Sequence, residues 1–197
     1  MARRSKLFIA VGCLLILGSL GLLITSQFQA KQAREKTVEI VREMEQILPS
    51  PREGVMDTWL DMEMPALELD GEDFIALVDI PALGVTLPVA GSWDAGKVNS
   101  YPCRFWGTVY DGSLIVGGAD QPGQFAGFDR IFDGSAVTLT DMTGAEFSYV
   151  VDRAERSKSA QAEVLMAGEA DLTLFARDAY SLEYIILRCV AEAAYLG

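Results

Sequence analysis

The sequence predicts a mainly β domain, built as a closed barrel or a sandwich, that follows an N-terminal membrane anchor and a helical segment. Residues 7–25 are apolar and uncharged, whereas short apolar or alternating segments recur from residue 74 onward with little helix between them. Glycine is frequent, at 18 of 197 residues, and helix-forming residues do not dominate the second half. Strands of this length and spacing are typical of barrels and sandwiches.

The N-terminal apolar segment, LFIAVGCLLILGSLGLLIT at 7–25, predicts a transmembrane helix. Its length matches the roughly 20 apolar residues that cross a bilayer as a helix. A cleaved signal peptide would have an apolar region of about 7–15 residues and small residues before the cut. Cleavage after Ala30 would place Phe28 where a small residue belongs. We therefore expect an uncleaved anchor.

The short tail at residues 1–6 carries Arg and Lys but no acid, which favours a cytoplasmic N-terminus and an extracytoplasmic domain. Lys31, Arg34 and Lys36 follow the apolar segment and act against that orientation. The acidic residues beyond them carry little weight in the positive-inside rule. We expect a single-pass protein of the cell membrane, held there through residues 7–25.

Residues 26–48 predict a helical stalk, and residues 49–72 predict a linker. Pro49 and Pro51 end the helix. The linker is acidic and rich in Met and Pro, and the β domain occupies residues 73–197. Apolar residues recur at helical spacing in the stalk, at Val38, Val41, Met44 and Leu48.

The β domain contains a series of strand patterns. Consecutive apolar residues in one of them, SLIVGGA, indicate a strand buried on both faces, and AVTLTD and AEFSYVV alternate around an MTG turn, which predicts a hairpin. Residues 153–168 predict a long connection with a helical middle. The strand patterns cover 74–81, 85–91, 113–119, 136–141, 145–151, 171–176 and 183–191.

Charge and composition exclude several functions. From Glu53 onward there are 8 Lys+Arg against 24 Asp+Glu, a net charge of −16, which would repel nucleic acid and anionic lipid. Solubility is the simpler interpretation of this charge, and a cationic partner such as a basic peptide is the alternative. The chain has no histidine, so Ser-His and Cys-His dyads and imidazole metal sites are excluded. We expect neither a metal nor another cofactor.

Several sequence segments resemble segments of the sortases and occur in the same order. Sortases are transpeptidases that attach proteins to the bacterial cell wall or to pili. The resemblance implies a closed β-barrel of about seven to eight strands on an N-terminal anchor, and it runs from about Asp73 to Glu192. The segments that show the resemblance are VDIPALGVTLPV, YPCRFWGTVYDGSLIVGGAD, TDMTGAEFSYVV and DLTLFARDAYSLEYIILRCV.

The resemblance fails at the catalytic positions. IVGGAD places Ala119 where the family has its histidine, and LTLFAR places Arg177 where it has its nucleophilic cysteine. Counted without a gap, Tyr184 falls where the family has its arginine, and a shift of one or two residues would place Glu183 or Leu182 there instead. A thiolate must attack the peptide carbonyl, an acid must protonate the leaving amine, and a cation must stabilise the oxyanion. Of these roles, only hydrogen bonding to the oxyanion is open to Tyr184.

Two acids follow these positions, Asp120 and Asp178. They have two interpretations: a new acid-base pair of carboxylates, or a salt bridge with Arg177 that fills a retired active site, and the salt bridge is the simpler one. Phe105 and Trp106 belong to an aromatic segment that suits either an extended peptide or packing at the barrel end.

The cysteines and serines offer weaker alternatives. Cys189 lies in an apolar strand without a base, so inert packing or a disulfide with Cys103 is a better interpretation than a relocated nucleophile. Ser157 and Ser159 flank Lys158 in a polar stretch that predicts a solvated loop rather than a Ser-Lys dyad.

The function that fits these observations best is a membrane-anchored sortase-like domain without transpeptidase activity. Its partner would be an extended peptide, a surface protein or an active sortase, and its role that of a binding or accessory factor in protein display. The alternatives are an active cysteine transpeptidase with displaced catalytic residues and an envelope scaffold without a ligand.

Overall fold

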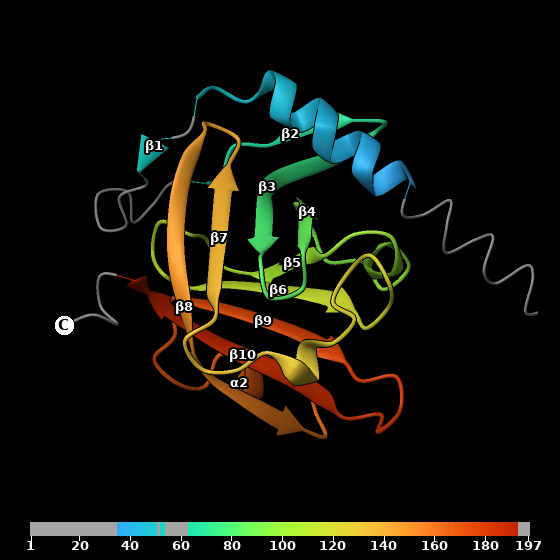
Figure 1. The fold of residues 1–197 in the computed structure, drawn as a ribbon, viewed down its shortest axis with the longest axis vertical. Helices are drawn as coiled ribbons and strands as arrows, with labels where there is room; N and C mark the ends of the chain where they lie inside the picture. The colour runs from blue at the N-terminus through green and yellow to red at the C-terminus, as the bar shows by residue number, and fades with distance from the viewer. Residues whose placement is uncertain (1–34, 51, 54–62, 193–197) are drawn as a thin grey trace, which may run out of the picture. The chain divides into compact units, whose positions relative to one another are not determined.

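The computed structural model describes residues 35–50, 52–53 and 63–192 (Figure 1). The chain divides into two compact units, Met1–Lys36 and Thr37–Gly197, and nearly all of the first lies outside the described residues. The predicted tail at 1–6 and the predicted anchor at 7–25 lie there too. Among the residues that are described, no helix is long and apolar enough to cross a membrane.

The described strands join in a single sheet. Two short strands extend the sheet at its ends: β1 pairs in parallel with β8, and β2 pairs with the start of β3. The strands are β1 Arg52–Glu53, β2 Leu67–Leu69, β3 Glu72–Ile80, β4 Val85–Ala90, β5 Cys103–Trp106, β6 Leu114–Ala119, β7 Ala136–Asp141, β8 Ala145–Ser157, β9 Leu172–Arg177 and β10 Tyr184–Ala191.

Eight of these strands close into a barrel, in the order β3-β4-β5-β6-β9-β10-β8-β7. Closure is possible because β7 pairs with both β3 and β8. The β4–β5 and β6–β9 pairs are parallel, and the other pairs in the ring are antiparallel. The ring closes between β4 and β5 through a single paired position, Ala90–Cys103, and closure reduces the open edge of the sheet. The mainly β fold and the predicted closed barrel are confirmed.

All seven predicted strands are present, and β8 continues six residues beyond its predicted end to Ser157. Helix α2, Ala162–Leu165, supplies the helical middle of the connection that follows. Three strands were not predicted: β1 and β2, which lie outside the ring, and β5, which belongs to it. The β2–β3 hairpin turns at Asp70–Gly71, where both residues have positive φ (54° and 77°), the conformation of a two-residue hairpin turn.

The barrel interior forms the main core. Inward-facing side chains from every strand of the ring except β5 pack there, and they alternate with outward-facing ones. Tyr149 and Leu139 are among the large side chains with almost no exposure. This core fixes the positions of the strand ends that carry the candidate site.

Two smaller apolar clusters lie outside the barrel wall. The helix, described over residues 35–47, packs on the wall through Ile40, Val41 and Met44, against Phe74 and Leu77 of β3. We call this the helix cluster. Residues 37–48 of the expected stalk therefore lie against the barrel. The second, the α2 cluster, joins Leu165 of α2 to side chains of three strands, Ile115, Phe175 and Ile186.

Candidate functional site

The three residues that the resemblance aligns with the catalytic positions of sortases lie side by side across neighbouring strands. Ala119 ends β6, Arg177 ends β9 and Tyr184 begins β10. Ala119 is in register with Arg177, and Arg177 is in register with Tyr184. Since neighbouring strands lie about 4.8 Å apart, the three residues span about 10 Å. We call them the Arg177 row.

The parallel pairing of β6 and β9 explains why residues 58 positions apart meet here. Parallel strands end at the same edge of a sheet, so the last residues of both strands become neighbours. β10 then returns antiparallel to β9 after a short loop, which brings Tyr184 to the same edge. The sheet thus assembles one site from three separate segments.

The guanidinium of Arg177 is exposed. Its Nε donates a 3.4 Å hydrogen bond to the carbonyl of Leu182, and no ion pair within the described part of the chain includes it. Arginine stays protonated, so this group cannot act as a nucleophile or a base. It can donate hydrogen bonds to carbonyl or carboxylate oxygens of a ligand.

Asp178 pairs with an arginine of another strand rather than with Arg177. Its Oδ1 accepts the N–H groups of Tyr180 and Ser181 at 2.8 and 3.1 Å, and its Oδ2 accepts Nη1 of Arg156 at 3.0 Å. These partners, with the Tyr180 N–H first, hold the pKa of Asp178 well below its usual range. The expected salt bridge with Arg177 is replaced by one with Arg156, because successive residues of an extended chain point to opposite sides.

Asp120 has a similar role at the end of β6. Its Oδ2 accepts the N–H of Ala179 at 3.0 Å, which links the β6 end to the β9–β10 loop. Beside it, the N–H of Ala119 donates to Oε1 of the buried Gln124 at 3.1 Å. Both carboxylates are thus engaged in holding loops around the Arg177 row, an arrangement that does not resemble an acid-base pair.

An aromatic cluster lies beside the row on the outer wall. The Phe175 ring stacks on Trp93 with centroids 5.6 Å apart, and it meets Phe105 edge-on at 5.7 Å and Tyr184 at 6.4 Å. Gly117 provides the space, since a Cβ there would collide with the rings of Trp93 and Phe175. The Trp93 side chain remains 40% exposed, so a ligand could reach this cluster.

Phe105 and Trp106 differ in their surroundings. Phe105 packs against the α2 cluster, while Trp106 is one of the most exposed aromatic side chains in the described chain. Two other members of the aromatic segment are structural: Tyr101 meets Phe74 edge-on, and the hydroxyl of Tyr110 donates to the buried Asp141 at 2.7 Å. Trp93 was not singled out in the sequence, although the Gly117–Gly118 pair is a signal of close packing by large side chains.

A buried arginine fixes α2 against the outer wall. Arg188 of β10 is 2% exposed, and its guanidinium donates to the carbonyls of Leu165 and Val164, the latter at 2.7 Å, and to Oγ1 of Thr173 at 3.2 Å. Its Nε lies 3.7 Å from Oε1 of Glu155. The cation thus satisfies carbonyls at the C-terminal end of α2, where positive charge is favourable.

Both described cysteines are free, so of the two interpretations the disulfide between Cys103 and Cys189 is wrong. The Cys103 side chain packs in the helix cluster outside the wall, and Cys189 packs in the barrel interior. Their strands, β5 and β10, are separated by β6 and β9. A disulfide requires Cα atoms within about 7 Å, whereas three strand spacings amount to about 14 Å along the wall.

Burial also makes these thiols unreactive. Burial raises the pKa of Cys189 to about 12 and raises that of Cys103 above its ordinary value. The thiolate is the nucleophilic form, and it is scarce at neutral pH for groups of this kind. Within the described ranges, no cluster of three or more Cys, Asp or Glu side chains is arranged to hold a metal ion.

Comparison with solved structures finds many sortases. The sortase D5 transpeptidase of Clostridium perfringens is 19% identical over 60% of this chain and 79% of its own, with a TM-score of 0.51. Sortase A from Corynebacterium diphtheriae is 15% identical over 82% of this chain and 81% of its own, with a TM-score of 0.52. Sortase C1 from Streptococcus agalactiae is 18% identical over 64% of this chain and 70% of its own, with a TM-score of 0.51. The fold is therefore sortase-like.

No family model and no curated protein matches the sequence. At identities below 20%, the structural likeness concerns the fold alone. The residues of the Arg177 row therefore have to be judged by their own chemistry.

Proposed function

We propose that this chain is a membrane-anchored, extracytoplasmic sortase-like protein that has lost transpeptidase chemistry and binds an extended peptide at the Arg177 row. The observation that carries the proposal is the register Ala119–Arg177–Tyr184 at the strand ends to which the resemblance assigns histidine, cysteine and arginine. Alanine cannot transfer a proton, and a protonated guanidinium cannot attack a carbonyl.

A relocated nucleophile is disfavoured by the surroundings of the thiols. Cys189 is fully buried, and its pKa of about 12 keeps it protonated. Cys103 is equally buried on the other side of the wall. An active transpeptidase with displaced residues would need one of these groups to reach a substrate.

Peptide binding is supported by what remains exposed at the row. The Arg177 guanidinium can donate to peptide carbonyls, and the exposed edge of Trp93, backed by Phe175, offers a flat apolar surface for a side chain. The partner we favour is a segment of a surface protein, or of an active sortase that this protein assists. Anchoring through residues 7–25 would hold the domain where such partners are displayed.

The test combines turnover and binding. The full chain in nonionic detergent is incubated with sorting-signal peptides and an amine acceptor, and cleaved or joined products are sought by mass spectrometry. We expect none. Binding of the same peptides is measured by Trp fluorescence, and we expect Arg177→Ala to weaken it about tenfold. Arg130→Ala, which removes another exposed arginine, is the matched control and should leave binding unchanged.

Other outcomes would decide between the alternatives. Turnover that disappears in Cys189→Ala would show a displaced nucleophile, and turnover that survives both Cys103→Ala and Cys189→Ala would show a different chemistry. A chain that binds none of the peptides and captures no partner from solubilised membranes would favour the scaffold. The triple variant Ala119→His, Arg177→Cys, Tyr184→Arg should recover at most a trace of acylation, because catalytic groups act as a unit.

A further inference from the structure

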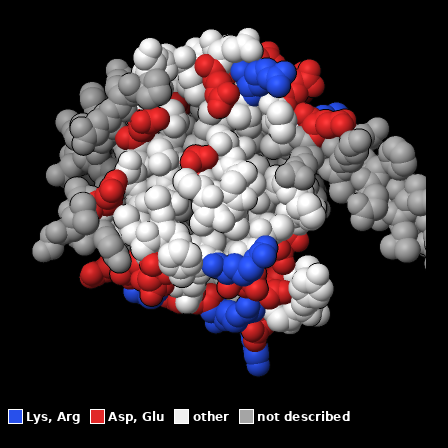
Figure 2. Space-filling view, viewed as in Figure 1, with Lys and Arg blue, Asp and Glu red and all other residues white. Residues whose placement is uncertain are grey.

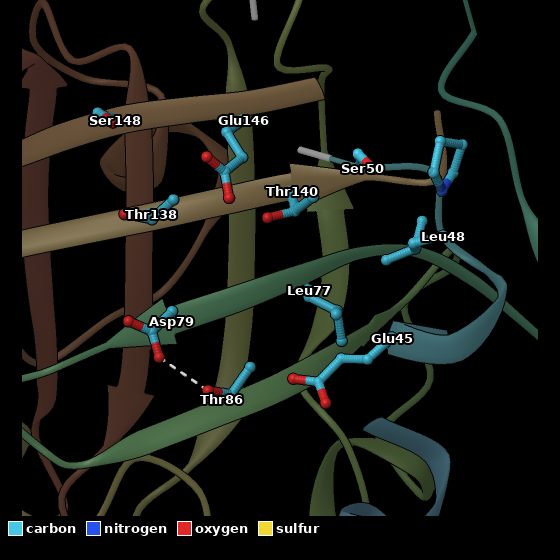
Figure 3. Close-up of a pocket in the computed structure, with 11 residues that line it drawn as sticks. Glu45, Leu48, Ser50, Leu77, Asp79, Thr86, Thr138, Thr140, Glu146 and Ser148 are labelled. Carbon is cyan, nitrogen blue, oxygen red and sulfur yellow. Dashed lines mark hydrogen bonds between the residues drawn. The ribbon is translucent and has the colours of Figure 1, made fainter. Parts of the chain in front are cut away.

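A second candidate site lies on the barrel wall formed by β3, β4, β7 and β8, where the helix ends. A hollow of about 650 Å³ opens there (Figure 3). Its lining is mostly hydroxyl and carboxylate side chains with a few apolar ones, and the described residues that line it include no Lys or Arg. The lining residues are Glu45, Leu48, Pro49, Ser50, Leu77, Asp79, Thr86, Thr138, Thr140, Glu146 and Ser148.

The strand register arranges this lining in two rows. Four strands contribute one polar side chain each to the first row, Thr86, Asp79, Thr138 and Ser148. The second row, two residues further along, consists of Leu77, Thr140 and Glu146. The Thr86 hydroxyl donates to Oδ1 of Asp79 at 2.8 Å and so fixes that carboxylate. The hollow is therefore floored by a flat polar surface.

Three carboxylates face this hollow, and no described Lys or Arg forms an ion pair with them. Figure 3 shows Glu146 reaching in from β8 and Glu45 from the helix, with Asp79 on β3. None of the three takes part in an ion pair among the residues that the structure describes. In Figure 2 the same face shows scattered Asp and Glu, and the Lys and Arg side chains lie toward its margins.

The helix adds to the negative electrostatic potential of the hollow. Its last turn, which ends at residue 47, brings its C-terminal end to the hollow beside Leu48 and Pro49. The C-terminal end of a helix carries a partial negative charge and unpaired carbonyls. A helix end and three side chains therefore contribute charge of the same sign from different elements. Phosphates, carboxylates and other anions are disfavoured here.

The spacing of the carboxylates indicates the shape of the ligand. Asp79 and Glu146 are two strands and one row apart, which places their Cα atoms about 12 Å from each other. No trio of acids in the described part is close enough to hold a metal ion. A long molecule with separated positive charges can reach carboxylates that a single ion cannot, and its apolar parts can contact Leu48 and Leu77.

We propose that this hollow binds a linear polyamine, an elongated cation whose ammonium groups are separated by methylene segments. The ammonium groups donate to Glu45, Asp79 and Glu146 and to the threonine hydroxyls, and the methylene segments lie on the leucines. The site is on a different part of the wall from the Arg177 row, so it does not depend on the peptide-binding proposal.

The experiment is a calorimetric titration of the full chain with spermine, in nonionic detergent at about 0.15 M salt so that weak surface charge is screened. We expect binding at one site per chain. The variant Glu45→Gln/Asp79→Asn/Glu146→Gln should bind at least about tenfold more weakly. The control Glu43→Gln/Asp133→Asn/Glu169→Gln changes the net charge equally at exposed positions outside the hollow and should bind as the unmodified chain does.

A single substitution keeps the test decisive if the triple variant does not fold. Thr140→Lys adds an ammonium group to the hollow itself and should abolish binding, while the melting temperature confirms that the chain is folded. Equal weakening in the pocket and control variants would overturn the proposal, since binding would then follow net charge alone. Failure of the unmodified chain to bind spermine, or equal affinity for a neutral oligosaccharide, would also overturn it.

Discussion

The barrel wall is covered on the outside by two helical segments that are held in different ways. Residues 37–47 lie on β3 and β4 through an apolar stripe that includes Ile40, Val41 and Met44. Helix α2 has four residues, buries only Leu165 and depends on hydrogen bonds from the buried Arg188. A longer amphipathic helix can be held by burial alone, whereas a single turn buries too little and needs a polar partner.

The two proposed sites also lie beside these two segments, one at the end of the helix and the other near α2. The helix ends beside a polar hollow whose lining is hydroxyl and carboxylate. The wall near α2 carries the exposed Arg177 and the Trp93–Phe175 stack. The outer wall of one barrel thus presents an acidic hollow in one place and an exposed arginine beside an aromatic stack in another, because outward-facing strand residues are free of the constraints of the core.

The largest expected effect concerns the helix side. Met44→Ala removes a side chain with 0% exposure and should lower the free energy of unfolding by about 3 kcal/mol, since it creates a cavity in the helix cluster. Urea denaturation followed by Trp fluorescence measures it. Val38→Ala, on the same helix but 53% exposed, should cost less than about 0.5 kcal/mol. Equal effects would mean that the helix is not held by its apolar stripe.

A smaller and more local effect is expected on the α2 side. Arg188→Met keeps much of the side-chain volume but leaves the carbonyls of Val164 and Leu165 without their donor, which should cost about 1–3 kcal/mol. Hydrogen exchange should rise mainly in residues 160–168, whereas Arg177→Met, at an exposed position, should leave it unchanged. A stabilised variant with unchanged exchange would show that apolar packing can replace the arginine.

The smallest effect should depend on pH and concerns the loop beside the Arg177 row. The pKa of Asp178 is depressed in the folded protein, so its stabilising effect is present above the pKa of the unfolded state, about 4. The effect is lost as pH falls through the lower, folded pKa. Asp178→Asn should therefore lower the melting temperature by a few degrees at pH 6 and by progressively less below pH 4. A difference that does not shrink in acid would mean that the loop is held by other contacts.

The strand predictions succeeded where the pattern is local. Alternation in residues 136–151 predicted the β7–β8 hairpin, and Pro49 marked the end of the helix. Strand β5 was missed because its four residues pair with β4 at one position only, Ala90–Cys103. Strand β2 has three residues, but the Asp70–Gly71 turn was a usable signal for its hairpin.

The sequence selected the residues of the candidate site but not the partners of its charged groups. The resemblance pointed to Ala119, Arg177 and Tyr184, and the register places them in one row. The partners of the charged groups could not be predicted, because Arg156 meets Asp178 only when β8, β9 and β10 are assembled. Burial on opposite sides of the wall, which separates Cys103 from Cys189, is likewise invisible in their spacing along the chain.

The sequence by itself determined the strand periodicity, the end of the helix just before Pro49 and the absence of a histidine, since each depends on residues close in the chain or on composition alone. Closure of the barrel through β7, the meeting of β6 with β9 and the two polar rows that floor the hollow were decided only by the tertiary structure. These features depend on pairings between distant segments, and their register is set by the packing of the whole core.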